Sequence, residues 1–138
     1  GIYLGLGQIR SQQRRYAEAV DLLSQAVEKG ARNSFVYGQL AYAQLSLNRN
    51  EEAIETFEKA FEAGIPPGAN TRGLAYYNMA CGYSRLKNYD KAFEMLNKAV
   101  DEGFETRNTY EKDTDLDALR ADPRFEKLLA RMPKPAGD

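Results

Sequence analysis

The sequence predicts an all-α fold, a solenoid of three stacked helix-turn-helix units followed by capping helices at the C-terminal end. Two observations carry this prediction. A block of sequence recurs three times, at spacings of 34 and then 39 residues, with small and large apolar residues in register. Within each block the apolar residues stand three and four positions apart, the spacing of one face of an α-helix. A single helix pair cannot bury both of its faces, so stacking of the three copies is expected to stabilise each of them.

Each block is expected to form two amphipathic helices joined by a short polar turn. The residues that recur in register are Ala19, Ala53 and Ala92, then Leu23, Phe57 and Leu96, then Ala26, Ala60 and Ala99. Each block closes on a glycine, at Gly30, Gly64 and Gly103. Glycine at this position predicts a left-handed C-cap. The repeats are expected at residues 1–33, 34–67 and 73–104, with an insertion at 68–72.

The blocks resemble tetratricopeptide repeats. The matching positions are Tyr3, Leu6, Gly7, Ala19, Leu23 and Ala26; Tyr37, Leu40, Ala41, Ala53, Phe57 and Ala60; and Tyr76, Met79, Ala80, Ala92, Leu96 and Ala99. The resemblance implies a right-handed α-solenoid that binds other proteins in a concave groove lined by the first helix of each repeat. Two features depart from the family pattern. The usual closing proline is Ala31, Ile65 or Phe104, and the usual aromatic residue at position eleven survives only as Tyr83.

Residues 105–132 start like a fourth repeat and then diverge, which predicts a helical cap over the last repeat. A capping-box-like start at Thr114 predicts a short helix through Arg120. Asp122 followed by Pro123 predicts an N-cap and the first turn of a final helix, ending near Arg131. The run D-x-D-L-x-x-L-R-x-D-P-R-F resembles a tail that follows terminal repeats in many bacterial proteins. Residues 133–138 are expected to be disordered.

Two more specific functional interpretations, a calcium-binding loop and a reactive thiol, do not fit the sequence. Alternating carboxylates from Asp113 could begin a calcium loop, but the sixth position is Ala118 and the twelfth is Arg124, where Gly and Glu are needed. Cys81 could be a reactive thiol, but the chain has no His to activate it. It is expected to be a small packing residue.

The composition argues against catalysis and against several kinds of partner. The chain has 138 residues, with 19 Lys and Arg against 20 Asp and Glu, and no His. Without His, nucleophile–imidazole pairs and His-ligated metals are excluded, so we expect no enzyme activity, no metal and no cofactor. The balanced charge argues against nucleic acid as a partner. The longest uncharged stretch, residues 34–48, is too polar to span a bilayer, so we expect no membrane partner and a soluble protein, with the cytoplasm favoured.

The binding groove is predicted from the resemblance to the family. The groove residues expected to contact a partner are Gln8, Gln12, Gln39, Tyr42, Asn78 and Arg85. Side-chain amides can pair with both donors and acceptors of an extended peptide, and Tyr adds rigid contact area. Three further aromatic or aliphatic residues at groove positions are expected either in the groove or in the core: Phe35, Leu74 and Tyr77. Ser46, Cys81 and Ser84 complete the set of predicted groove positions.

One subfamily is excluded residue by residue. Chaperone-binding members hold a terminal carboxylate with Lys, Asn, Asn, Lys and Arg at fixed groove positions. The matching positions here are Leu4, Gln8, Gln39, Leu74 and Asn78. Because every cation is missing, charge-assisted capture of a terminal carboxylate is not expected.

The leading hypothesis for function is a non-catalytic scaffold that binds a peptide or helix of another protein. The alternative is a terminal regulatory or positioning domain of a larger enzyme or regulator; the start at Gly1, inside a repeat, favours this. An enzyme is not expected, because Glu51, Glu52, Glu55 and Glu58 fit a solvated helix face with Asn50 as its N-cap. Weak self-association is also expected, because Tyr3, Leu4 and Ile9 could lack a covering neighbour.

Overall fold

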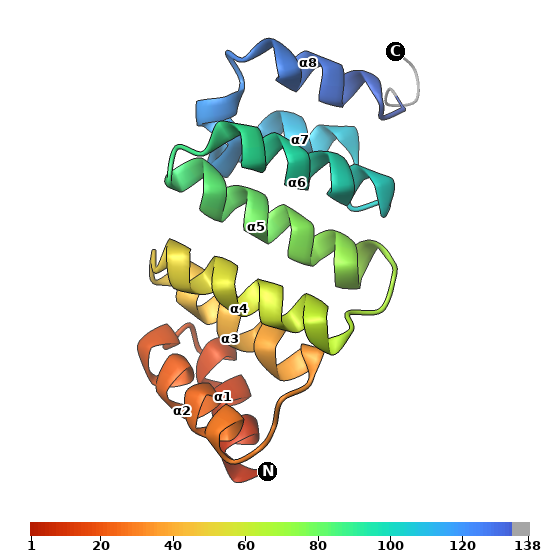
Figure 1. Ribbon diagram of the computed structural model, residues 1–138. Coiled ribbons are helices and arrows are strands. Elements are labelled where there is room, and N and C mark those ends of the chain that lie inside the picture. The colour runs from red at the N-terminus through yellow and green to blue at the C-terminus, as the bar shows by residue number, and fades with distance from the viewer. Residues whose placement is uncertain (134–138) are drawn as a thin grey trace. The chain divides into compact units, whose positions relative to one another are not determined.

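The computed structural model describes residues 1–133, and within that range the regular secondary structure is helical throughout, as predicted (Figure 1). The chain forms two compact units, Gly1–Ile65 and a second that begins at Pro66. The residues for which disorder was expected, 133–138, lie outside the described range except for Pro133.

The first unit contains two helical pairs. Its helices are α1 (Ile2–Gln12), α2 (Tyr16–Glu28), α3 (Ser34–Ser46) and α4 (Asn50–Ala63). Each helix packs against its neighbour in the chain, and α1 also contacts α3. The core between α2 and α3 is formed by the buried residues Ala19, Val20, Leu23, Leu40 and Ala43. The recurring small and large apolar residues therefore meet as the repeat pattern predicts.

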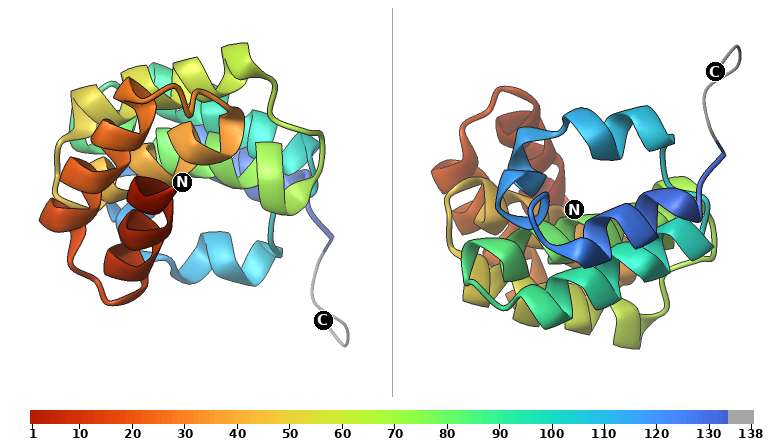
Figure 2. Two further views of the ribbon diagram at one scale, coloured as in Figure 1. Left: turned by 90° about the horizontal axis from the view of Figure 1, so that it is seen from below. Right: turned by 90° about the horizontal axis from the view of Figure 1, so that it is seen from above.

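The second unit contains the third pair and the tail. Its elements are the π-helix η1 (Ala69–Gly73), α5 (Leu74–Arg85), α6 (Tyr89–Asp101), α7 (Arg107–Lys112), the 3₁₀-helix η2 (Thr114–Leu119) and α8 (Pro123–Ala130). Helix α5 packs against α6, η2 contacts α5, and α8 contacts both α6 and α7 (Figure 2). The tail residues therefore pack on the third helical pair.

The glycines that end the second helices have positive φ angles, as predicted. The turns within the pairs reach the same left-handed conformation without glycine, at Arg14, Asn48 and Lys87, with φ close to 60°. At Asn48 this turn corrects the prediction for α4. The N–H of Arg49 donates to the carbonyl of Gln44 at 2.9 Å, and Arg49, not Asn50, is the N-cap. Arg49 therefore closes α3 through this hydrogen bond and is also the N-cap of α4.

The insertion at 68–72 becomes an irregular first turn of α5 rather than a loose loop. The N–H of Gly68 donates to the Glu102 carboxylate at 3.0 Å. Gly73 lies so close to the end of α6 that an added Cβ would be 3.0 Å from Cβ of Phe104. The inserted residues therefore pack on α6 and extend α5 at its N-terminal end.

The tail differs from its prediction in detail. The short helix is a 3₁₀-helix capped by Asp113, whose side chain accepts the N–H of Asp115 at 2.9 Å, and it ends at Leu119. Thr114 is thus its first residue and not its cap. Asp122 caps α8 as predicted, accepting the N–H of Arg124 at 2.9 Å.

Candidate protein-interaction surfaces

The first unit exposes an aromatic stripe on α3. Phe35, Gln39 and Tyr42 stand at positions i, i+4 and i+7, so they share one face of the helix. Phe35 is 53% exposed and Tyr42 is 44% exposed, while Gln39 is half-buried. Aromatic residues are enriched in protein interfaces relative to the rest of the surface. This α3 stripe contains two of the predicted groove residues, Gln39 and Tyr42. Phe35, which the sequence placed either in the groove or in the core, lies on the surface.

The hydroxyl end of the α3 stripe lies in a defined polar environment. The Tyr16 ring stands edge-on to the Tyr42 ring, with centroids 6.1 Å apart. Partial burial, followed by the neighbouring Tyr16, raises the pKa of the Tyr42 hydroxyl, while Ser46 and the nearby Arg14 oppose that rise. Tyr42 therefore remains a neutral hydroxyl at physiological pH, able to donate or accept a hydrogen bond.

The other two predicted residues of the first unit lie on α1. Gln8 is half-buried and Gln12 is exposed, one turn apart. Helix α1 contacts α3 within this unit. The structure therefore gathers Gln8, Gln12, Gln39 and Tyr42 on two contacting helices.

Asn78 and Arg85 belong to α5 in the second unit. Asn78 is half-buried. The Arg85 guanidinium pairs with Asp115 of η2, with 3.7 Å between nitrogen and oxygen. The one cation predicted for the groove is thus engaged by the acidic run of the tail, a partner that the repeat pattern alone did not indicate.

Tyr77 is a core residue. Its ring lies 4.9 Å from that of Phe104 and 5.5 Å from that of Tyr110, measured between centroids, and its hydroxyl donates to Asp113. Burial and this hydrogen bond raise the pKa of the hydroxyl far above its usual range. The sequence placed three residues either in the groove or in the core. Of these, Phe35 and Leu74 are exposed and Tyr77 is buried.

Arg120 of the tail motif fixes the turn that carries the acidic run. Its guanidinium donates to the carbonyl of Tyr110 at 3.0 Å and to the carbonyl of Asp113. It also lies over the Phe125 ring, 5.2 Å from the centroid. These contacts hold Asp113 and Asp115 beside α5, so in this motif Arg120 and Asp113 act as structural residues.

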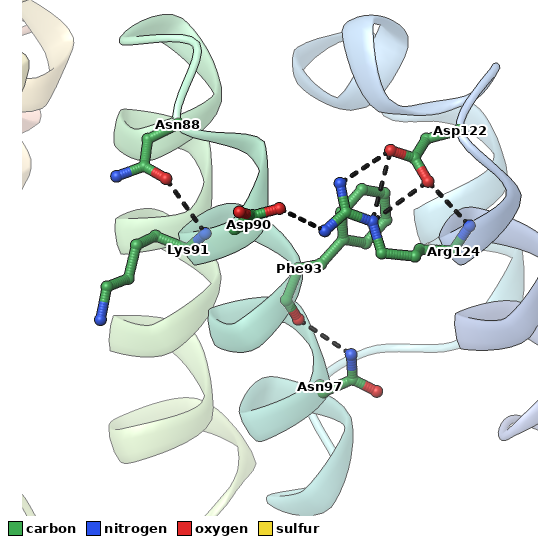
Figure 3. Close-up of polar contacts among 7 residues, drawn as sticks. All are labelled: Asn88, Asp90, Lys91, Phe93, Asn97, Asp122 and Arg124. Atoms are coloured by element: carbon green, nitrogen blue, oxygen red, sulfur yellow. Dashed lines mark hydrogen bonds and ion pairs between the residues drawn. The ribbon is translucent and has the colours of Figure 1, made fainter.

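Arg124 joins the tail to α6 (Figure 3). It pairs with Asp122 at 2.8 Å and with Asp90 at 2.6 Å, and its guanidinium lies 4.6 Å from the centroid of the Phe93 ring. The planar guanidinium can make both kinds of contact at once. One turn after Phe93 on α6, the Asn97 side chain accepts a hydrogen bond from Arg131 at 2.6 Å.

Cys81 is buried, which confirms that it is a packing residue. Burial first, then the carboxylates of Asp115 and Asp113, raise the pKa of its thiol to about 12. Thiolate is the reactive form, so the folded protein holds this sulfur in its unreactive state at neutral pH.

Among the described residues there is no cluster of three or more His, Cys, Asp or Glu side chains that could hold a metal ion. In the same range, every helix is too short or too polar to cross a membrane.

The residues of the first helix that the sequence predicts to be exposed differ in part from those that the structure exposes. Leu4 packs against the core between α2 and α3, and Tyr3 is half-buried. The aliphatic residues that α1 exposes are Ile2, Leu6 and Ile9. The reason is geometric, because Leu4 lies on the helix face that meets α2 and these three residues lie on another.

The class of protein is indicated by the fold together with a family match. Residues 34–101, just under half of the chain, match the tetratricopeptide repeat family. This segment spans α3 to α6. Together with the all-helical fold of stacked pairs, the match shows a tetratricopeptide-repeat fold.

Individual proteins show the same likeness. The chain is 34% identical over 90 residues to a chloroplast protein of Arabidopsis thaliana, an alignment that covers 64% of this chain and 26% of that protein. The matched part thus spans about a quarter of the length of this curated relative. A crystal structure of MamA has a TM-score of 0.73 at 19% identity, covering 94% of this chain and 73% of MamA. YrrB, described as a TPR protein with an unusual peptide-binding site, has a TM-score of 0.70 at 19% identity, covering 94% of this chain and 63% of YrrB.

Proposed function

We propose that this chain is a non-catalytic scaffold whose first unit binds an extended segment or a helix of a partner protein on α1 and α3. The α3 stripe carries the proposal, because Phe35 and Tyr42 expose large aromatic rings on one helix face. Aromatic side chains supply much of the binding energy of protein interfaces. The amides of Gln8, Gln12 and Gln39 supply the donors and acceptors that an extended backbone needs.

The partner segment that fits this surface is mostly uncharged. In the first unit, Arg10 is paired with Glu18 at 3.1 Å, and Arg15 is paired with the same carboxylate group at 2.7 Å. Arg14, close to Tyr42, is the cation that could meet an acidic residue of the partner at one end of the α3 stripe. The proposed ligand is therefore an apolar or aromatic segment with main-chain contacts to the amides.

The experiment is a selection of phage-displayed 12-residue peptides on the full chain, followed by affinity measurements on the best binder. The double variant Phe35→Ala/Tyr42→Ala should weaken binding by roughly 30-fold or more, as expected for hot-spot aromatics. Gln39→Ala should have a smaller effect. The matched control is Glu55→Ala/Glu58→Ala, on the exposed face of α4.

The same binder also tests the two groove residues of the second unit. Asn78→Ala and Arg85→Ala are expected to leave the affinity within a few-fold of wild type, because Arg85 is already paired with Asp115. Equal affinity for the wild type and the Phe35/Tyr42 variant, with both proteins folded by circular dichroism, would contradict the proposal.

We propose in addition that residues 105–132 cap the third helical pair. The observation in support is that Arg124 and Arg131 bind α6, while Leu116, Leu119 and Phe125 are buried. The charged outer residues of α8, such as Glu126 and Lys127, are exposed. Such a polar outer face is what terminal repeats need for solubility.

A second candidate function is a regulatory or positioning domain within a longer protein. The alignment with the Arabidopsis chloroplast protein covers only 26% of that relative, which is the arrangement expected of one domain among others. The complete coding sequence of the gene tests this candidate, and an open reading frame that adds no further domain would rule it out.

A further inference from the structure

The charges of the first unit are segregated between its helices. Every acidic residue of Gly1–Ile65 lies on α2 or α4, whereas α1 and α3 contain none. The turn that follows α1 carries Arg14 and Arg15, and the turn that follows α3 carries Arg49. The two helices of the proposed binding surface are thus without acidic side chains, and cations follow the C-terminal end of each.

The turn between α1 and α2 holds Arg14 beside one end of the α3 stripe. Tyr16, two residues after Arg14, packs edge-on against Tyr42, with 6.1 Å between the ring centroids. The N–H of Arg14 donates to the carbonyl of Ser11 at 3.0 Å, which fixes the turn. The charge of Arg14 lies near enough to Tyr42 to oppose the rise in the pKa of that hydroxyl. The α3 stripe therefore runs from Phe35 to Tyr42 and has a cation at its Tyr42 end.

Arg14 differs from the two neighbouring arginines in its ion pairs. Arg10 and Arg15 both pair with Glu18, at 3.1 and 2.7 Å. Arg14 is exposed, and among residues 1–133 its guanidinium has no carboxylate partner. Its five N–H donors are therefore available to an acceptor on another molecule.

We propose that the partner segment bound by the α3 stripe carries an acidic residue, Asp or Glu, whose carboxylate pairs with Arg14. This inference rests on the function proposed above and specifies the partner of the same surface. A guanidinium can hold a carboxylate through two parallel hydrogen bonds. Because the pair lies at an exposed position, it adds less to the affinity than the aromatic contacts do, and it fixes the register of the segment.

The length of the α3 stripe sets where the acidic residue falls in the partner. Phe35 and Tyr42 are seven positions apart in a helix. At a rise of about 1.5 Å per residue, their Cα atoms are separated by about 10 Å along the helix axis. An extended segment covers that distance in about three residues. An apolar residue that packs on Phe35 is therefore expected about four positions from the acidic residue that meets Arg14.

The acidic residues of the described chain are not the source of this carboxylate. In the acidic run of the tail, Asp113 accepts a hydrogen bond from Tyr77 and Asp115 pairs with Arg85, both within the second unit. An acidic segment of a partner protein is repelled by the carboxylates of α2 and α4 and attracted to the arginine end of the α3 stripe. Charge complementarity thus directs such a segment to this surface.

The test is a double-mutant cycle between the chain and the best peptide of the phage selection, synthesised with both ends blocked. Replacing its acidic residue with the corresponding amide should weaken binding to the wild type roughly three- to tenfold. The same replacement should weaken binding to Arg14→Asn by less than about twofold, because the partner charge is already gone. Arg14→Lys keeps the charge and should keep most of the acid effect.

Both substitutions fit the turn, because the chain already contains them at equivalent positions. Asn48 and Lys87 occupy the same place in the second and third pairs, with φ angles of 60° and 61° against 59° at Arg14. The control variants are Arg49→Gln and Arg32→Gln. Arg32 precedes α3 at the Phe35 end, where it donates to the carbonyl of Val27 at 3.3 Å. Both controls should keep the full acid effect.

Selected peptides without Asp or Glu at this spacing would overturn the proposal, as would an acid effect of equal size in the wild type and in Arg14→Asn. An acid effect that disappears in Arg49→Gln or Arg32→Gln and persists in Arg14→Asn would also overturn it. In each of these cases, binding that is still lost in Phe35→Ala/Tyr42→Ala would leave the proposed scaffold function intact. Binding unchanged in that double variant would contradict the scaffold function itself.

Discussion

Gly7 shows how closely the first two helices approach. A Cβ added to Gly7 would lie 2.8 Å from Cγ of Leu23, which is itself fully buried. The equivalent residues of the other two repeats are Ala41 and Ala80, and both are fully buried. The first pair therefore needs glycine at a position where the other pairs accommodate a methyl group.

Gly7→Ala should lower the free energy of unfolding by about 1–3 kcal/mol, the usual cost of overpacking a core. This loss runs against helix propensity, which by itself would favour alanine by about 0.5–1 kcal/mol. The matched control is Gly5→Ala on the same helix, where nothing beyond its chain neighbours and the nearby backbone of the helix lies within 4 Å of the added Cβ, and which should gain stability. Urea unfolding measures both. A gain in both variants would show that the approach of α1 and α2 is looser than described.

Among the helices, the tail is bound to α6 at a spacing of one repeat. Arg124 pairs with Asp90, and Arg131 donates to Asn97, both 34 residues earlier in the chain. Equivalent positions of successive second helices thus lie side by side, so α8 occupies the place of a second helix of a fourth repeat. The first helix of that repeat is reduced to α7 and followed by η2.

The carboxylate of Asp122, which pairs with Arg124, makes this junction sensitive to acid. Hydrogen bonds from Arg124 hold the pKa of Asp122 below its usual value. A carboxyl group with a lowered folded-state pKa stabilises the fold above its unfolded pKa, near 3.9, and this contribution is lost as the pH falls through the folded-state pKa. Arg124→Ala should therefore lower the thermal midpoint most at pH 6–7 and progressively less below about pH 4.

Thermal melts of the wild type and of Arg124→Ala between about pH 2.5 and 7 check this prediction. The control is Lys91→Ala, which removes an ion pair with Glu94 inside α6 and leaves the junction with the tail intact. A difference between wild type and Arg124→Ala that stays constant over this pH range would mean that the ion pairs contribute nothing and that only the contact with Phe93 matters.

The molecule as a whole is divided into two compact units. Leu23 in the first unit and Leu96 in the second are equivalent residues of the repeat, and both are fully buried. In repeat proteins, stability is approximately a sum of local and nearest-neighbour contributions. A cavity in one unit is therefore expected to act mostly on that unit.

Leu23→Ala should destabilise by about 2–5 kcal/mol. Hydrogen exchange should accelerate mainly in α1 to α4, because these helices belong to the same compact unit as Leu23. Leu96→Ala is the matched variant and should accelerate exchange mainly in α5 and α6. Uniform acceleration over both units in either variant would show a single cooperative unit instead.

The helices and their pairing could be predicted from the sequence alone. The apolar spacing, the recurring alanines and the closing glycines are local signals, and each acts within one helix or one turn. Asp122 was found as an N-cap for the same reason, because a cap depends on its immediate neighbours. The N-cap of α4 was predicted one residue too late, at Asn50, because the left-handed turn at Asn48 makes Arg49 the cap.

The accessibility of the predicted groove residues, in contrast, depends on the tertiary fold. Phe35 and Tyr77 both stand at groove positions of the repeat, yet one is exposed and the other is buried. Tyr77 is covered by residues more than thirty positions later in the chain, because Tyr110 packs on its ring and Asp113 accepts its hydroxyl. Whether the side chain of a groove residue is buried depends on which distant residues of the chain pack against it. The local repeat pattern contains no information about those residues.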